Sequence, residues 1–166
     1  MRTFVLLSAL PGSGKSTWAK QFAKEHPNTH IVSSDAIREK YFGSPQNFKH
    51  ENEVWEIFLR ECNEYAEKEE DCYVIADSTN ILNKFRRFYL ENTPKFDKHI
   101  LVCFRIPYEI AVKQNQMRPK EKIVPDYAME RMRDQFEIPS DEIIDAFDEY
   151  IVIGKSFIAE TLKNEK

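Results

Sequence analysis

The residues with the clearest chemical potential are two glycines, a lysine and a serine in the segment ALPGSGKST, which spans residues 9–17. Gly12 and Gly14 lack a Cβ atom, so the backbone can turn several N–H groups toward one anion. A helix that begins here would add unpaired N–H groups and the positive end of its dipole. Lys15 supplies a mobile positive charge, and the Ser16 hydroxyl is placed to coordinate Mg²⁺. The segment therefore predicts a cradle for the phosphates of ATP with its Mg²⁺.

The sequence on either side of this segment supports the same interpretation. An apolar run from Phe4 to Leu7 precedes it and a helix-like stretch over residues 17–23 follows it, as in a strand, glycine loop and helix unit. Ala9 stands where the strict pattern G-x-x-x-x-G-K-S has its first glycine, which is tolerable if residue 9 has an ordinary φ. A plain glycine turn is the alternative. The residues expected to contact the nucleotide in this segment are Gly12, Ser13, Gly14, Lys15, Ser16 and Thr17.

An acid and an arginine follow the next apolar segment. Asp35 and Arg38 are three residues apart, so they would share one side of a helical turn. The carboxylate could accept the proton of an acceptor hydroxyl, and the planar guanidinium suits the acceptor or the moving phosphoryl group. In the alternative interpretation Ser34 or Asp35 only caps a helix and Arg38 lies on its surface. We expect Asp35 and Arg38 to act in catalysis and in substrate binding.

A third apolar run ends in an acid, at Asp77. An acid in this position is similar to the second metal-organising element of phosphate-loop enzymes, so Asp77 could orient Mg²⁺ and lie beside the substrate. Thr79 and Asn80 follow it. They could contact the substrate, or they could cap the helix predicted over residues 82–90.

Basic residues gather in the segment 108–136, which we interpret as a helical lid. Closing such a segment over the nucleotide would exclude water and bring positive charge onto the phosphates. We expect Arg118 to do this, in nucleotide binding and in catalysis. A solvated charged hairpin is the alternative. Arg86 and Arg87 lie on the helix predicted over residues 82–90, where exposure to solvent is the preferred interpretation.

Five short segments rich in aliphatic and β-branched residues alternate with helical ones. This pattern predicts an α/β fold, a doubly wound parallel five-stranded sheet with helices on both faces. The clearest helical periodicity covers about residues 51–69. In such a sheet the chemistry collects at the carboxyl ends of the strands, where the glycine segment, Asp35 and Asp77 are all expected. The predicted strands are Thr3–Ser8, His30–Ser33, Tyr73–Ala76, Ile100–Arg105 and Tyr150–Ile153.

Composition limits the remaining possibilities. The 166 residues, of which 42% are hydrophobic and 31% charged, are expected to form one domain over residues 1–166, and no role is assigned to residues 155–166. The three cysteines form no C-x-x-C pair, which favours free thiols in a reducing, cytoplasmic compartment. The first apolar run is too short to span a bilayer, so no membrane partner is expected. The net charge of −4 argues against broad capture of duplex nucleic acid but is compatible with a small acceptor or a strand end.

Together these motifs resemble the kinase domain of the phage-type polynucleotide 5′-kinases, over about the first 140 residues. The resemblance implies a P-loop kinase fold that uses ATP and Mg²⁺. In that family the aspartate matching Asp35 is the general base on the 5′-hydroxyl, and the arginine matching Arg38 engages the acceptor or the transferring phosphate. Lys15 and Ser16 match the contacts to ATP and Mg²⁺, and Arg118 matches a lid arginine directed at the donor phosphates. The motifs, which match in order and spacing, are Leu10–Trp18, Ser34-Asp35-x-x-Arg38, Val74–Asn80, Val112–Arg118 and Val124-Pro125.

Departures from the family pattern narrow the expectation. Gln114 stands where the family often has a second lid arginine, and no phosphatase motif of the Asp-x-Asp-Gly-Thr type occurs. We expect a free-standing kinase module that transfers the γ-phosphate of ATP to the 5′-hydroxyl end of DNA or RNA, a nucleic-acid repair reaction. The alternatives are a kinase of a small metabolite, a nucleoside or a nucleotide sugar, similar to the zeta toxins, and a nucleotide-binding module without catalysis. The sequence gives no oligomeric state.

Overall fold

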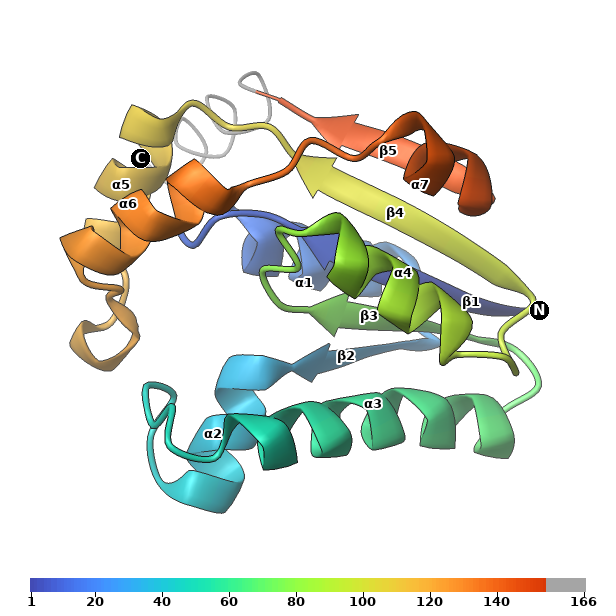
Figure 1. Ribbon diagram of the computed structural model, residues 1–166. Coiled ribbons are helices and arrows are strands. Elements are labelled where there is room, and N and C mark those ends of the chain that lie inside the picture. Colours follow the sequence, from blue (N-terminus) through green and yellow to red (C-terminus); the bar gives the residue numbers. More distant parts are fainter. Residues whose placement is uncertain (155–166) are drawn as a thin grey trace.

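The computed structural model describes residues 1–154, which form a five-stranded sheet with helices on both faces (Figure 1). Every pair of neighbouring strands is parallel, and the strand order is β2-β3-β1-β4-β5. The first strand of the chain therefore lies in the middle of the sheet. The strands are β1 (Arg2–Ser8), β2 (Thr29–Ser33), β3 (Cys72–Asp77), β4 (Lys98–Phe104) and β5 (Glu149–Ile153).

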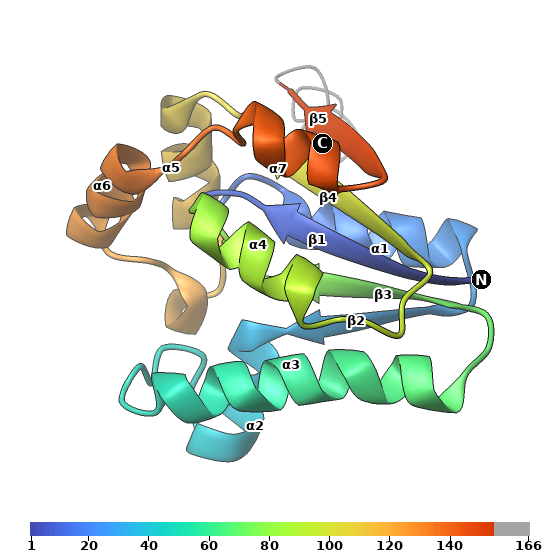
Figure 2. The ribbon, with the colours of Figure 1, turned by 45° about the vertical axis from the view of Figure 1, so that its right-hand side comes forward.

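The helices form two layers and a separate group beyond the sheet. In Figures 1 and 2, α1 (Lys15–Glu25) covers one face, and α3 (Glu51–Lys68), α4 (Asn83–Glu91) and α7 (Asp141–Ala146) cover the other. The short α2 (Ser34–Phe42) continues directly from β2. The remaining elements lie beyond the carboxyl ends of the strands and are α5 (Tyr108–Gln116), the 3₁₀ helix η1 (Lys120–Lys122) and α6 (Asp126–Gln135).

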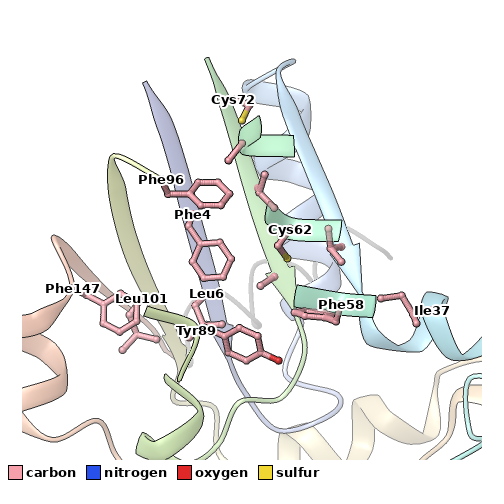
Figure 3. Packing of buried hydrophobic residues seen from close by; sticks show 14 of the residues in the cluster. Phe4, Leu6, Ile37, Phe58, Cys62, Cys72, Tyr89, Phe96, Leu101 and Phe147 are labelled. Carbon is pink, nitrogen blue, oxygen red and sulfur yellow. The ribbon is translucent and has the colours of Figure 1, made fainter. Parts of the chain in front are cut away.

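The centre of β1, Phe4–Leu7, is a continuous apolar run, and both of its faces are buried. Phe4 and Leu6 belong to the core cluster beneath α3, α4 and α7, which Figure 3 shows from close by. Val5 and Leu7 point the opposite way, into the cluster packed against α1. The alternation of side chains along a strand thus supplies two separate cores, and it explains why the sequence shows a continuous hydrophobic run.

The fold predicted from the sequence is confirmed. Each predicted strand exists within one or two residues of its expected bounds, and the helix predicted over 51–69 is α3. The cysteines Cys62, Cys72 and Cys103 are buried free thiols, as expected. Within residues 1–154, no helix is both long and apolar enough to cross a membrane. The segment 155–166, to which no role is assigned, lies outside the described residues.

Candidate functional site

The phosphate loop between β1 and α1 has the conformation that its glycines predict. Gly12 and Gly14 have φ angles of +80° and +85°, in the left-handed region that glycine enters without strain. Gly14 is the N-cap of α1, so Lys15 and Ser16 occupy the first turn of that helix. Ala9 does not have a positive φ, and its N–H donates to Thr79 O at 2.8 Å. Alanine is therefore tolerated where the strict pattern has glycine.

Gly12 is also the point where α5, the first helix of the predicted lid, touches the phosphate loop. Gln114 Nε2 donates to Gly12 O at 2.8 Å. A Cβ atom on Gly12 would lie 2.2 Å from Ala111 O and 2.8 Å from Asn115 N, both backbone atoms of α5. Gln114, in place of an arginine of the resembled family, thus anchors α5 to the loop.

Gly12→Ala is expected to destabilise the protein by more than the roughly 1–3 kcal/mol of a strained φ alone, because the added methyl group also collides with α5. Thermal unfolding and ADP binding would measure this loss. Gly43→Ala is the matched control, since Gly43 has a φ of +84° but open space around the added Cβ. If both variants lost equal stability, the close contact between Gly12 and α5 would not contribute to the loss.

Lys15, Ser16 and Asp77 form a compact group where β3 ends beside the loop. Ser16 Oγ donates to Asp77 Oδ2 at 2.9 Å, and Lys15 Nζ lies 3.5 Å from Asp77 Oδ1. Asp77 is buried, and its Oδ1 accepts no hydrogen bond from the described residues. A hydroxyl and a carboxylate whose buried Oδ1 accepts no hydrogen bond fit Mg²⁺, which takes few protein oxygens and keeps water and phosphate oxygens as its other ligands. The two side chains could therefore hold the metal ion expected with ATP.

Asp35 lies in the first turn of α2 and is held by two arginines. Arg38 Nη1 donates to Asp35 Oδ1 at 3.1 Å, and Arg118 Nη2 donates to Asp35 Oδ2 at 3.2 Å. Ser33 caps α2 by accepting from Ala36 N at 3.3 Å, so Asp35 is not the cap. The acid that follows β2 and the arginine that follows α5 are thus brought together by the fold.

Arg38 is more deeply placed than an arginine on a helix surface. It is 5% exposed, and its Nε and Nη2 donate to both carboxylate oxygens of Glu51 at 3.1 and 2.8 Å. Its guanidinium also lies 4.7 Å from the ring centre of Phe48. Arg38 therefore joins α2 to the first turn of α3 while its edge borders the cavity beside Asp35.

Two cavities meet at Lys15 and Arg118, which line both of them. The smaller, of about 230 Å³, is lined by the phosphate loop and α5, including Gly12, Gly14, Ser16, Thr17 and Gln114. The larger, of about 490 Å³, contains Asp35, Arg38, Asp77 and Thr79. The two cavities thus adjoin at a lysine and an arginine, and the Asp35 carboxylate contacts that arginine.

Two expected contact residues do not line either cavity. Asn80 is buried with a φ of 45°, and its Nδ2 donates to Leu7 O at 2.9 Å. It is no helix cap either, because α4 begins at Asn83 after Leu82. The cap interpretation of Asn80 is therefore wrong, and its side-chain amide links its own turn to β1. Ser13 is also buried and outside both cavities.

The expectation for Arg86 was wrong and that for Arg87 is confirmed. Arg86 is fully buried and donates to Ser8 Oγ and Asn83 Oδ1. Arg87 is exposed on a different side of α4 and pairs with Glu142 at 2.9 Å. Adjacent residues on a helix point about 100° apart, so one arginine of the pair faces the sheet and the other faces solvent.

Several residues of the larger cavity were not expected from the sequence. They come from the turn before α3, from α3 itself and from the lid, and they are aromatic or charged. The first turn of a helix favours an acid, which was the available signal for Glu51. The other residues belong to no recognisable sequence motif, and only the folded structure brings them to the cavity. These residues are Phe48, Glu51, Trp55, Lys122, Tyr127 and Arg131.

Comparisons with known proteins agree with this architecture. An L-seryl-tRNA(Sec) kinase from Methanococcus maripaludis is 29% identical over 143 residues, which are 81% of this chain and 52% of the relative. The chain thus spans about half the length of that relative. A chain of the Pnkp1/Rnl/Hen1 RNA repair complex is similar with a TM-score of 0.71 and 23% identity, covering 89% of this chain and 46% of that one. A gluconokinase from Sinorhizobium meliloti gives a TM-score of 0.64 at 14% identity, covering 99% and 97%.

The family model described as the AAA domain AAA_33 matches residues 5–139. This range includes β2, β3, β4 and the second half of β1, and it also includes the phosphate loop, Asp35 and Arg118. The similar solved structures agree with this chain in fold at low sequence identity. The chain therefore belongs to the AAA_33 family and has the P-loop kinase fold.

Proposed function

We propose that this protein is an ATP-dependent kinase that transfers the γ-phosphate to the 5′-hydroxyl end of DNA or RNA. The observation that carries the proposal is the junction of the two cavities, where Lys15 and Arg118 border both sides and Arg118 contacts Asp35. Such a junction is what in-line transfer needs, because donor phosphates and an acceptor hydroxyl must approach one another beside a base.

In the proposed reaction the acceptor oxygen attacks the γ-phosphorus, and the bond from that phosphorus to the bridging oxygen of ADP breaks. The Asp35 carboxylate takes the proton of the acceptor hydroxyl. Lys15 and Arg118 stabilise the charge on the transferring group and on the leaving ADP. Ser16 and Asp77 would hold Mg²⁺, which would supply positive charge to the phosphates of ATP. Arg38 holds Asp35 toward the junction and presents positive charge to the acceptor.

The lining of the larger cavity favours an anionic acceptor with an aromatic base. Phe48 and Tyr127, which are 55% and 71% exposed, line this cavity together with the half-buried Trp55 of α3. Exposed rings of this kind stack on nucleobases. The cavity is basic although the whole chain has a net charge of −4, because five basic residues outnumber three acidic ones. They are Lys15, Arg38, Arg118, Lys122 and Arg131, against Asp35, Glu51 and Asp77.

The relatives support the proposal in part. The names of the archaeal relative and of the RNA repair complex both refer to RNA. The gluconokinase is named for a small acceptor, which makes a small metabolite or nucleoside the second candidate. The cytoplasmic location expected from the free thiols is part of the same proposal.

The deciding experiment measures transfer from γ-labelled ATP to DNA and RNA oligonucleotides with a 5′-hydroxyl end. Matched oligonucleotides with a 5′-phosphate end are the control, and nucleosides, gluconate and simple alcohols are tested in parallel. We expect label on the 5′-hydroxyl oligonucleotides alone. Label on a small alcohol alone would establish the second candidate, and nucleotide binding without any transfer would establish a non-catalytic module.

Phe48→Ala is expected to raise the KM for a 5′-hydroxyl oligonucleotide about tenfold, since stacking on an aromatic side chain contributes roughly 1–3 kcal/mol per base. Steady-state kinetics at saturating ATP would measure this. Phe85→Ala is the matched control, because Phe85 is a comparably exposed phenylalanine on α4 that lines neither cavity. A fall in kcat with no change in KM would instead assign Phe48 to the support of Arg38.

A further inference from the structure

We propose that Arg86, a buried arginine of α4, is a positioning residue that fixes the ends of β1 and β3 relative to each other. Its exposed fraction is 0%. Nε and Nη2 both donate to Ser8 Oγ, at 3.2 and 2.8 Å, and Nη1 donates to Asn83 Oδ1 at 2.7 Å. Within residues 1–154 no carboxylate forms an ion pair with this guanidinium. A full charge is thus held under the phosphate loop by two neutral side-chain oxygens.

A buried guanidinium without an ionic partner destabilises the folded state, so we ask what its hydrogen bonds contribute. Removing a guanidinium from water is unfavourable, and burial lowers the pKa of Arg86 from its ordinary value. An apolar side chain would fill the same space at less cost. What the arginine adds is a rigid fork of donors that can fix one oxygen in place, here the Ser8 hydroxyl.

The position of the Ser8 hydroxyl matters because Ser8 is the last residue of β1. Its hydroxyl donates to Asn80 O at 2.7 Å, and the next residue, Ala9, donates from its N–H to Thr79 O at 2.8 Å. These two bonds join the chain that leaves β1 to the chain that leaves β3. The first of these segments begins the phosphate loop, and the second follows directly from Asp77.

The functional consequence concerns Ser16 and Asp77, whose oxygens are 2.9 Å apart and belong to these two segments. The inference rests on the proposed Mg²⁺ role of this pair. If the segments shifted relative to each other, the two oxygens would no longer suit one ion. Arg86 lines neither cavity, so it would act through Ser8. Residues that orient metal ligands in this indirect way commonly change metal affinity by about 10–100-fold when altered.

The test is calorimetric titration of ADP with and without Mg²⁺, on variants of the full chain. Arg86→Lys keeps the positive charge but loses the fork, and Ser8→Ala removes the shared acceptor with little change of volume. Both are expected to reduce the Mg²⁺-dependent gain in ADP affinity about tenfold, with ADP affinity in EDTA unchanged. If Arg86→Lys is unfolded in its thermal melt, the Ser8→Ala result decides.

Two further variants separate this inference from its premise. Asn83→Ala removes the other partner of Arg86 and leaves the β1 to β3 bonds intact, so it should keep the full Mg²⁺-dependent gain. Asp77→Asn should abolish the gain, and if it does not, the metal site itself is wrong. If Asp77→Asn abolishes the gain while Arg86→Lys and Ser8→Ala both keep it, Arg86 only stabilises the fold and the positioning role is overturned.

Discussion

Asp35→Asn is expected to lower the rate of phosphoryl transfer by about 10²–10⁴-fold, the usual contribution of a general base. The amide keeps the size of the side chain and an oxygen for Arg38 or Arg118, but it cannot take the acceptor proton. ATP binding should persist, because Asp35 does not line the smaller cavity against the phosphate loop. Single-turnover transfer at saturating ATP, together with a separate titration of ATP binding, would measure both effects.

The control for this variant comes from the same helix. Glu39→Gln removes a carboxylate from α2 at an exposed position outside both cavities, so it should transfer phosphate at the parent rate. A parent-like rate for Asp35→Asn would exclude the base role. Its carboxylate would then serve only to place the two arginines.

Arg118→Ala is expected to reduce transfer about 10³-fold, at the lower end of the effect of arginines that stabilise transferring phosphoryl groups. The reason is its position, since Arg118 borders both cavities and reaches Asp35 at 3.2 Å. Loss of its charge should lower kcat more than it raises the KM for ATP, because the charge on the transferring group is greatest in the transition state. Steady-state kinetics with ATP varied at saturating acceptor would separate the two.

Arg133→Ala is the comparison on the same lid. Arg133 is exposed near the end of α6, stacks on Tyr108 at 4.7 Å and lies outside both cavities. If Arg133→Ala and Arg118→Ala reduced transfer equally, the effect would come from the general positive charge of the lid. A selective loss with Arg118→Ala places the effect at the junction of the cavities.

The sequence could predict those parts of the site that are determined by residues close together in the chain. The phosphate loop depends on backbone conformation that glycine determines locally, so Gly12 and Gly14 indicate it directly. Asp35 and Asp77 follow apolar strands, and the common direction of parallel strands brings such residues to one edge. The five strands could be found for the same reason, since a buried parallel strand is a short apolar run.

The parts that could not be predicted depend on contacts between distant segments. Arg86 and Arg87 are neighbours of the same type, and only the orientation of α4 on the sheet decides which one is buried. Asparagine is a residue type common in binding sites and in helix caps, yet the side-chain amide of Asn80 donates to Leu7 O. Glu51 is 13 residues from Arg38, and nothing in that interval predicts their bidentate pair.

Ala9 has a consequence for how related chains can be detected. Its methyl group is fully buried and its backbone is unstrained, so the volume of the side chain, and not the backbone conformation, limits which residues fit at this position. Screens that require glycine there treat a size limit as a conformational one and would overlook genuine members. A profile that admits any small side chain at the first position, and keeps strict glycine only where the chain turns left-handed, would recover them.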